Sequence, residues 1–149
     1  MTEAFRPCVL AVFQNRDGLV LMAQRKEPRG AWQFPQGGIE SGEAAEAALA
    51  REMREELGVE ALEIVQRVAA PIPYLFPADA GALAQKFRGQ AQVWFLVRLA
   101  AGATVDLARA TDDEFVATAW VAPAEALRRI VAFKKEAYAQ GLRALGLVS

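Results

Sequence analysis

Three carboxylates stand within one helical turn of the segment at residues 51–59: Glu52, Glu55 and Glu56. Carboxylates this close together repel one another and resist burial. A divalent cation bound among them would offset that repulsion, because such ions prefer oxygen ligands. A glycine-rich turn at residues 37–42 comes shortly before the helix that is predicted to carry these carboxylates. Together these features predict metal-assisted chemistry on a phosphate compound.

The helix predicted over residues 44–57 places one of these carboxylates on its apolar side. At about 100° per residue, with Leu49 at the centre of the apolar stripe, Glu56 falls at about −20°. A solvated acidic face with pairs such as Arg51–Glu55 is the ordinary explanation of a charge run. That explanation does not suit Glu56, because an unpaired carboxylate in an apolar sector is costly. The pattern therefore favours a metal-bound Glu56.

The composition excludes several classes of function. The 149-residue chain has no histidine, which excludes Ser-His and Cys-His nucleophilic catalysis and histidine-ligated zinc. Its net charge of −1 argues against a broad electrostatic contact with duplex DNA. The single cysteine, Cys8, has apolar neighbours and suits a packing role in a reducing compartment. Without a signal peptide or a membrane-spanning segment, we expect one cytoplasmic domain over residues 1–149.

The remainder of the chain is predicted to mix strands and helices that position the acidic helix. Asp17-Gly18 predicts a hairpin turn, Ser41 is a candidate N-cap of the acidic helix, and Gly58 a residue that ends it. Residues 71–89 are rich in Pro, Gly and Ala and are expected to form a loop. Without a βαβ rhythm, the order of elements predicts an α+β fold with a mixed sheet between helices. Strands are expected at residues 8–14, 19–24, 32–34, 62–70, 91–99 and 114–121, and helices at 44–57, 123–129 and 135–145.

The spacing of the glycine turn and the acidic helix resembles the signature box of the Nudix hydrolases at every defined position. The matching residues are Gly37, Glu43, Arg51, Glu52, Met53, Glu55, Glu56, Gly58 and Val59. The resemblance implies the Nudix α/β/α sandwich and hydrolysis of a nucleoside diphosphate linked to another group, with Mg²⁺ or Mn²⁺ as cofactor. It also implies that Glu52, Glu55, Glu56 and the Gly37 carbonyl are metal ligands, and that Glu43 and Arg51 form a structural ion pair.

Motifs outside the box resemble the bacterial RNA pyrophosphohydrolase group, which overlaps with the diadenosine polyphosphate hydrolases. These motifs are Phe5-Arg6-Pro7, residues 32–38, residues 89–95, Glu114-Phe115 and Phe133-Lys134. By this resemblance Glu114 adds a carboxylate to the metal site. One carboxylate would deprotonate the attacking water, and the candidates for this base are Glu52, Glu56 and Glu114. The residues that would hold the substrate are Arg6, Arg25, Gln36, Phe133 and Lys134.

Two substrates remain open from the sequence. The leading expectation is removal of pyrophosphate from the 5′-triphosphate end of RNA. The alternative is cleavage of a dinucleoside polyphosphate, such as diadenosine tetraphosphate or pentaphosphate, or of a free nucleotide. Phe5, Leu10 and Gln24 depart from the residues usual in the RNA pyrophosphohydrolase group, and residues 71–86 contain few basic residues. A non-catalytic nucleotide sensor is disfavoured, because a pure binding protein has no evident need for all three box glutamates.

Overall fold

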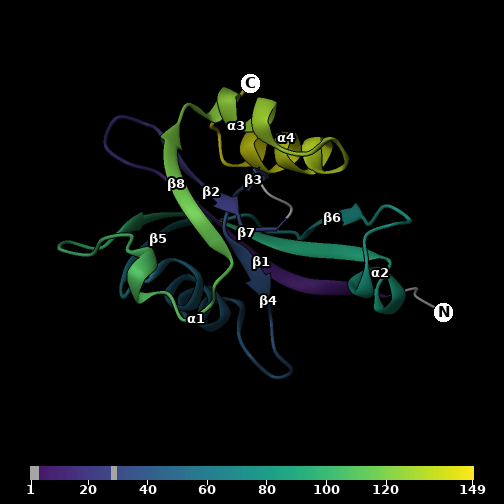
Figure 1. The fold of residues 1–149 in the computed structure, drawn as a ribbon. Helices are drawn as coiled ribbons and strands as arrows, with labels where there is room; N and C mark the ends of the chain where they lie inside the picture. Colours follow the sequence, from purple (N-terminus) through teal and green to yellow (C-terminus); the bar gives the residue numbers. More distant parts are fainter. Residues whose placement is uncertain (1–3, 28–29) are drawn as a thin grey trace.

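Two β-sheets lie between helices in the computed structural model of this chain, which describes residues 4–27 and 30–149 (Figure 1). The strands are β1 (Phe5–Phe13), β2 (Val20–Arg25), β3 (Trp32–Gln33), β4 (Gln36–Gly38), β5 (Leu62–Arg67), β6 (Ile72–Leu75), β7 (Gly89–Leu99) and β8 (Phe115–Val121). The helices are α1 (Ala45–Leu57), α2 (Ala82–Lys86), α3 (Pro123–Arg129) and α4 (Lys135–Ala144), with 3-10 turns at Leu107–Arg109 and Ala132–Lys134.

The larger sheet is mixed and contains the order β4-β1-β7-β5, with β6 also paired to β7. Its central strands β1 and β7 run parallel, whereas β4, β5 and β6 are antiparallel to their neighbours. The smaller sheet has the order β3-β2-β8. Helix α1 covers one side of this assembly, and α3 and α4 lie together on the other (Figure 1). The α+β class and the α/β/α sandwich are therefore confirmed, with the strands divided between two sheets.

Strand β1 is apolar on both faces because each face meets a different core. Val9, Ala11 and Phe13 belong to the cluster that includes the apolar side of α1. Leu10 and Val12 alternate with them and belong to the cluster that includes α3 and α4. Since successive side chains of a strand point to opposite faces, one unbroken apolar run supplies both cores. This arrangement packs β1, and the strand β4 paired to it, against α1.

The turn predicted at Asp17-Gly18 is present, but the strands on either side of it enter different sheets. The Asn15 side chain accepts hydrogen bonds from the backbone N–H groups of Asp17 and Leu19, both at 3.0 Å. Within the described residues, β1 and β2 are joined only by the isolated bridge of Gln14 with Val20. The reason is that β1 already pairs with β7 and β4, so β2 pairs with β8 instead.

The prediction of a loop over residues 71–89 is wrong. Ile72 and Tyr74 are buried, and the strand β6 that contains them pairs with the start of β7. Helix α2 follows in the same segment. The sequence did not predict this strand because it contains Pro73, and a proline usually argues against a strand. Proline is tolerated here because β6 is paired on one side only among the described residues, so its missing N–H costs no ladder bond.

Helix α1 begins one residue later than predicted and ends where predicted. Its N-cap is Ala44, which supplies no side-chain hydrogen bond, so the assignment of Ser41 as N-cap is wrong. Gly58 adopts a left-handed φ of 64°, and its N–H bonds the Arg54 carbonyl at 3.1 Å. A left-handed glycine of this kind is a common helix end. No helix in the described part of the chain combines the length and apolar character needed to cross a bilayer.

Candidate active site

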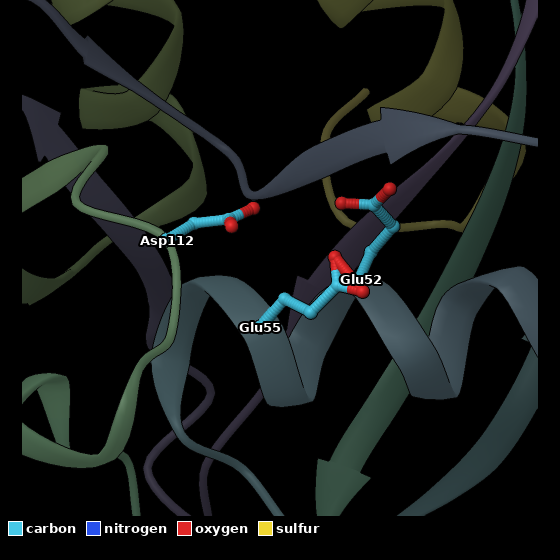
Figure 2. Close-up of side chains that lie close together, drawn as sticks. All are labelled: Glu52, Glu55 and Asp112. Atoms are coloured by element: carbon cyan, nitrogen blue, oxygen red, sulfur yellow. The ribbon is translucent and has the colours of Figure 1, made fainter.

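Three carboxylates meet beside α1 (Figure 2). Glu52 and Glu55 come from the helix, and Asp112 comes from the loop that precedes β8. One oxygen atom of each carboxylate lies within 4.8 Å of an oxygen of the other two. Such a set of hard oxygen donors is the kind that binds Mg²⁺, Mn²⁺ or Ca²⁺. The structure thus brings together two of the predicted metal ligands and one residue that the sequence analysis missed.

Asp112 could have been found from the acidic run Asp112-Asp113-Glu114. Residues two apart in an extended segment point to the same side, so a role for Glu114 suggests one for Asp112. The structure attaches this loop to the helix, because the Asp112 backbone N–H donates to the Glu55 carbonyl at 2.9 Å. That bond brings the loop against the C-terminal part of α1.

Glu56 is the buried member of the acidic group, as its position on the helical wheel predicts. Its side chain lies on the buried side of α1 and only 1% of the residue is exposed. Neither of its carboxylate oxygens has a hydrogen-bond partner among the described residues. Burial, and then the neighbouring carboxylate of Glu114, raise the pKa of Glu56 to about 11. Such a group must either hold a proton or bind a cation, so the orphaned oxygens fit a divalent ion.

Gly37 leaves the space that Glu52 occupies. A Cβ atom added to Gly37 would lie 2.0 Å from Cδ of Glu52 and 2.1 Å from its Oε2. A glycine in β4 therefore lets this carboxylate pack directly on the strand backbone. Burial raises the pKa of Glu52 above its ordinary value. The role of the Gly37 carbonyl as a metal ligand remains a prediction, but a carboxylate pressed on this backbone suits it.

Arg51 links the glycine turn to the acidic helix through hydrogen bonds. Its Nε and Nη2 donate to the two carboxylate oxygens of Glu43 at 2.9 and 2.8 Å, and Nη2 also donates to the Gly38 carbonyl at 2.9 Å. Its Nη1 donates to Oε1 of Glu52 at 2.9 Å. Two parallel bonds of this kind are geometrically specific and strong. Arg51 therefore fixes the turn and also orients a predicted metal ligand.

We expect Glu43→Gln to lower thermal stability more than it lowers turnover. The hydrogen bond from Arg51 lowers the pKa of Glu43 to about 2, from an ordinary value of 4.5. Because the pKa is lowered by folding, the stabilisation is complete above about pH 4.5 and is lost as the pH falls through about 2. The variant should therefore melt a few degrees lower at pH 7, and the difference should shrink as the pH falls below 4.

Calorimetry of both proteins across this pH range measures the effect. Glu46→Gln is the matched control, because Glu46 lies three residues further along, in the first turn of α1, and pairs with Arg67 at the surface. An unchanged melting temperature together with lost activity would place Glu43 among the catalytic residues instead.

Arg25 lines two hollows, one at the acidic loop of residues 112–114 and one that is larger. A hollow of about 430 Å³ on one side is lined by Arg25, Asp112 and Glu114. A cavity of about 600 Å³ on the other is lined by Arg25, Trp32, Phe133 and Lys134, among others. The pairing of β2 with β8 shifts register at Arg25, and such irregularities redirect side chains near functional sites. The Arg25 Nε atom is buried and has no hydrogen-bond partner among the described residues.

Phe133 and Lys134 line the larger cavity, and both lie close to the Tyr74 ring. Phe133 is 41% exposed, and its ring centroid lies 5.8 Å from that of Tyr74. The Lys134 ammonium lies 5.5 Å from the Tyr74 ring centroid, although the residue is only 6% exposed. Burial, and then the nearby Arg25 charge, lower the pKa of Lys134 to about 8. The structure thus brings Arg25, Phe133 and Lys134 together, and a buried Lys134 is not the solvated cation that its type alone suggests.

Arg6 lies in β1 and Gln36 lies in β4, the strand paired to it. Arg6 packs on the glycine turn, because a Cβ atom added to Gly38 would lie 2.5 Å from its Nη2. Gln36 accepts a hydrogen bond from Nε2 of Gln92 at 2.6 Å and donates to Oε1 of Gln90 at 3.3 Å. The Tyr74 hydroxyl donates to the same Gln90 oxygen at 2.9 Å. The sequence analysis missed this buried amide network. The signal in the sequence was the pair of glutamines, Gln90 and Gln92, at the start of a largely apolar strand.

Comparison with known proteins identifies the family. Residues 4–141 match the model of the NUDIX domain, so the chain belongs to the Nudix family and is a Nudix hydrolase. It is 42% identical to an RNA pyrophosphohydrolase of Erythrobacter litoralis (strain HTCC2594), covering 90% of this chain and 86% of that one. It is 38% identical to Nudix hydrolase 25 of Arabidopsis thaliana, covering 98% and 89%. Among solved structures, a C. elegans Ap4A hydrolase binary complex shares the fold, with a TM-score of 0.67, 19% identity and coverage of 95% and 98%.

Proposed function

We propose that this Nudix hydrolase removes pyrophosphate from the 5′-triphosphate end of RNA, with Mg²⁺ or Mn²⁺ as cofactor. The observation that carries the proposal is the shared wall at Arg25, which joins the acidic loop to a cavity containing an exposed aromatic ring and a buried cation. A polyphosphate attached to a nucleoside needs both parts, a metal site for the phosphates and a stacking surface for the base. The similarity to RNA pyrophosphohydrolases over most of the chain supports the same substrate.

The carboxylates of the site would have two roles, which are to bind the divalent ion and to accept a proton. Glu52, Glu55, Glu56 and Glu114, with the Gly37 carbonyl, would hold the divalent ion, which when bound offsets the negative charge of the phosphates. Glu56 and Glu114 lie side by side, and burial together with the neighbouring Glu114 carboxylate raises the pKa of Glu56. This pair is therefore suited to accept the proton of the attacking water as the phosphoanhydride bond breaks and pyrophosphate leaves.

The cationic and aromatic residues would orient the substrate. Arg6 and Arg25 present guanidinium groups, which suit phosphate oxygens, and Lys134 adds a charge beside the stacking surface. Phe133 offers an exposed ring to the first bases of the RNA. In this assignment the base lies in the larger cavity and the phosphates extend past Arg25 towards the acids.

A dinucleoside polyphosphate is the second candidate substrate, because the larger cavity has another aromatic wall. Trp32 lines it, and the Arg129 guanidinium lies 5.3 Å from the Trp32 ring centroid. A stacked pair of this kind could hold a second base. The net charge of −1 also favours a small substrate over an extended nucleic acid.

The test is product analysis with a triphosphorylated RNA and diadenosine tetraphosphate side by side, for the wild type, Phe133→Ala and Lys134→Ala. Stacking contributes roughly 1–3 kcal/mol per base, so we expect Phe133→Ala to raise KM for RNA by at least about fivefold. Lys134→Ala should weaken binding in a salt-dependent manner. Hydrolysis of a triphosphate ester without a base should persist in both variants, since the carboxylates are unchanged.

Trp120→Ala is a suitable control for the loss of an aromatic ring, because Trp120 is exposed on β8 and lines a different hollow. If neither Phe133→Ala nor Lys134→Ala alters RNA kinetics at low or moderate salt, the assigned nucleotide site is wrong. If diadenosine tetraphosphate is cleaved much faster than RNA, the second substrate replaces the first.

A further inference from the structure

We propose that Asp112 is a ligand of the divalent-cation site, completing with Glu52 and Glu55 an outer cation position that the signature box alone does not contain. The inference rests on the proposed metal-dependent hydrolysis and specifies which residues of this chain bind the ions. Asp112 lies far from the box in sequence, on the loop before β8. The geometry that carries the assignment is the convergence of three carboxylates, one oxygen of each lying within 4.8 Å of the others (Figure 2).

The loop that bears Asp112 is fixed on both sides. On the helix side, the Asp112 N–H donates to the Glu55 carbonyl at 2.9 Å. On the strand side, the Lys26 N–H donates to the Glu114 carbonyl at 2.9 Å, and the Lys26 ammonium pairs with the carboxylate of Asp113. These contacts direct neighbouring side chains differently. Asp113, whose side chain is 80% exposed, meets a lysine, whereas Asp112 meets two carboxylates that a cation could share.

A second observation points to a cation at this place. Glu56 is almost completely buried, and both of its carboxylate oxygens lack partners among the residues that the structure describes. The carboxylates whose charges act on it are those of Glu114, Glu52 and Asp112. The buried Glu56 and the exposed Asp112 thus belong to a group of acids whose charges interact, within which the oxygens that converge within 4.8 Å are those of Glu52, Glu55 and Asp112. Arg51 pairs with Glu52 and Glu55 at 2.9 and 3.5 Å, whereas the structure shows no cationic partner for the Glu56 oxygens within residues 4–27 and 30–149.

The two ends of this group are suited to different cation positions. Glu56 and Glu114 form the inner end, and Glu55 and Asp112 form the outer end. Glu52 belongs to both ends, because it converges with the outer pair and its charge also acts on Glu56. Carboxylate oxygens are the preferred ligands of Mg²⁺ and Mn²⁺. A cation at the outer end would also link α1 to the loop before β8, and so hold Glu114 in place for the reaction.

The experiment is an Mn²⁺ titration, without substrate, of the wild type, Asp112→Asn and Asp113→Asn, followed by the electron paramagnetic resonance signal of free Mn²⁺. The two variants remove the same charge from adjacent residues, and Asp113→Asn also breaks the exposed ion pair with Lys26, so loss of loop charge or of loop contacts would show in the control at least as strongly. We expect Asp112→Asn to bind fewer Mn²⁺ ions or to weaken their affinity by at least about tenfold, while Asp113→Asn binds as the wild type does. The Mn²⁺-induced rise in melting temperature should decrease in the same variant alone.

Each outcome decides the inference. Wild-type Mn²⁺ binding by Asp112→Asn overturns it, and so does equal weakening in both variants, which would indicate a general effect of loop charge. In either case hydrolysis by the wild type leaves the proposed function standing. If the wild type itself binds no Mn²⁺ and hydrolyses RNA equally well in EDTA, the metal-dependent function fails and the inference fails with it.

Discussion

Glu56→Gln is expected to reduce turnover by at least about 10²-fold, because it removes a predicted metal ligand that is also a candidate general base. The same substitution should raise the stability of the metal-free protein. Glu56 is buried without hydrogen-bond partners among the described residues, so its ionised form is costly in the folded chain. A glutamine has nearly the same shape and no charge. The variant therefore separates the cost of this carboxylate in folding from its use in catalysis.

The sign of the stability effect follows from the pKa of Glu56, which folding raises from an ordinary value of 4.5 to about 11. Between these values the folded wild type binds a proton that the unfolded chain does not, so its stability falls as the pH rises. The glutamine variant lacks this dependence. In EDTA, its advantage should grow from pH 5 to pH 9 and reach at least about 2 °C, given that 1 kcal/mol shifts the midpoint by roughly 2–4 °C in domains of this size.

Saturating Mn²⁺ should reverse the order of the two melting temperatures. A ligand that binds only the folded state stabilises it by mass action, and the wild type retains the carboxylate that the variant lacks. Scanning calorimetry with EDTA and with Mn²⁺ measures both halves of the prediction, and turnover is measured alongside. Wild-type turnover by the glutamine variant, or full wild-type activity in EDTA, would remove the basis for a metal site at Glu56.

Gly37→Ala is expected to abolish most activity without unfolding the protein. The added Cβ would lie 2.0 Å from Cδ of Glu52, whereas ordinary van der Waals contact begins at 3.4 Å. The Gly37 backbone is outside the left-handed region, so alanine is compatible with it, and the flexible end of Glu52 must move instead. Moving a reacting group by about 1 Å can cost on the order of 10²-fold in rate. The variant should therefore fold normally, bind Mn²⁺ more weakly and lose turnover.

Gly38→Ala is the matched control for this prediction. Its Cβ would meet Nη2 of Arg6 at 2.5 Å rather than Glu52. It should therefore leave Mn²⁺ affinity unchanged and act on KM for the substrate, if Arg6 binds the phosphates. Mn²⁺ titration and steady-state kinetics of both variants distinguish the two effects. Normal Mn²⁺ binding and turnover in Gly37→Ala would show that the position of Glu52 against β4 is not required.

The features that the sequence determined by itself are those that depend on local periodicity. Glu52, Glu55 and Glu56 lie on one helix because they are neighbours in the chain, and the helical repeat alone predicts that Glu56 is buried. The end of α1 at Gly58 follows from the freedom of glycine to adopt a left-handed φ. The signature spacing from Gly37 to Val59 also lies within one continuous segment. For these features, tertiary contacts do not compete with the local preference.

The tertiary structure decided which distant segments meet. The largely continuous apolar runs of β1 and β7 indicate that both faces of these strands are buried, but they do not specify the partner of each face or the division into two sheets. The pairing of β2 with β8 brings Glu114, and with it Asp112, to the acidic helix. The pairing of β6 with β7 places the Tyr74 ring next to Phe133 and Lys134. These contacts depend on strand register between segments far apart in the chain, and no local preference of the residues encodes that register.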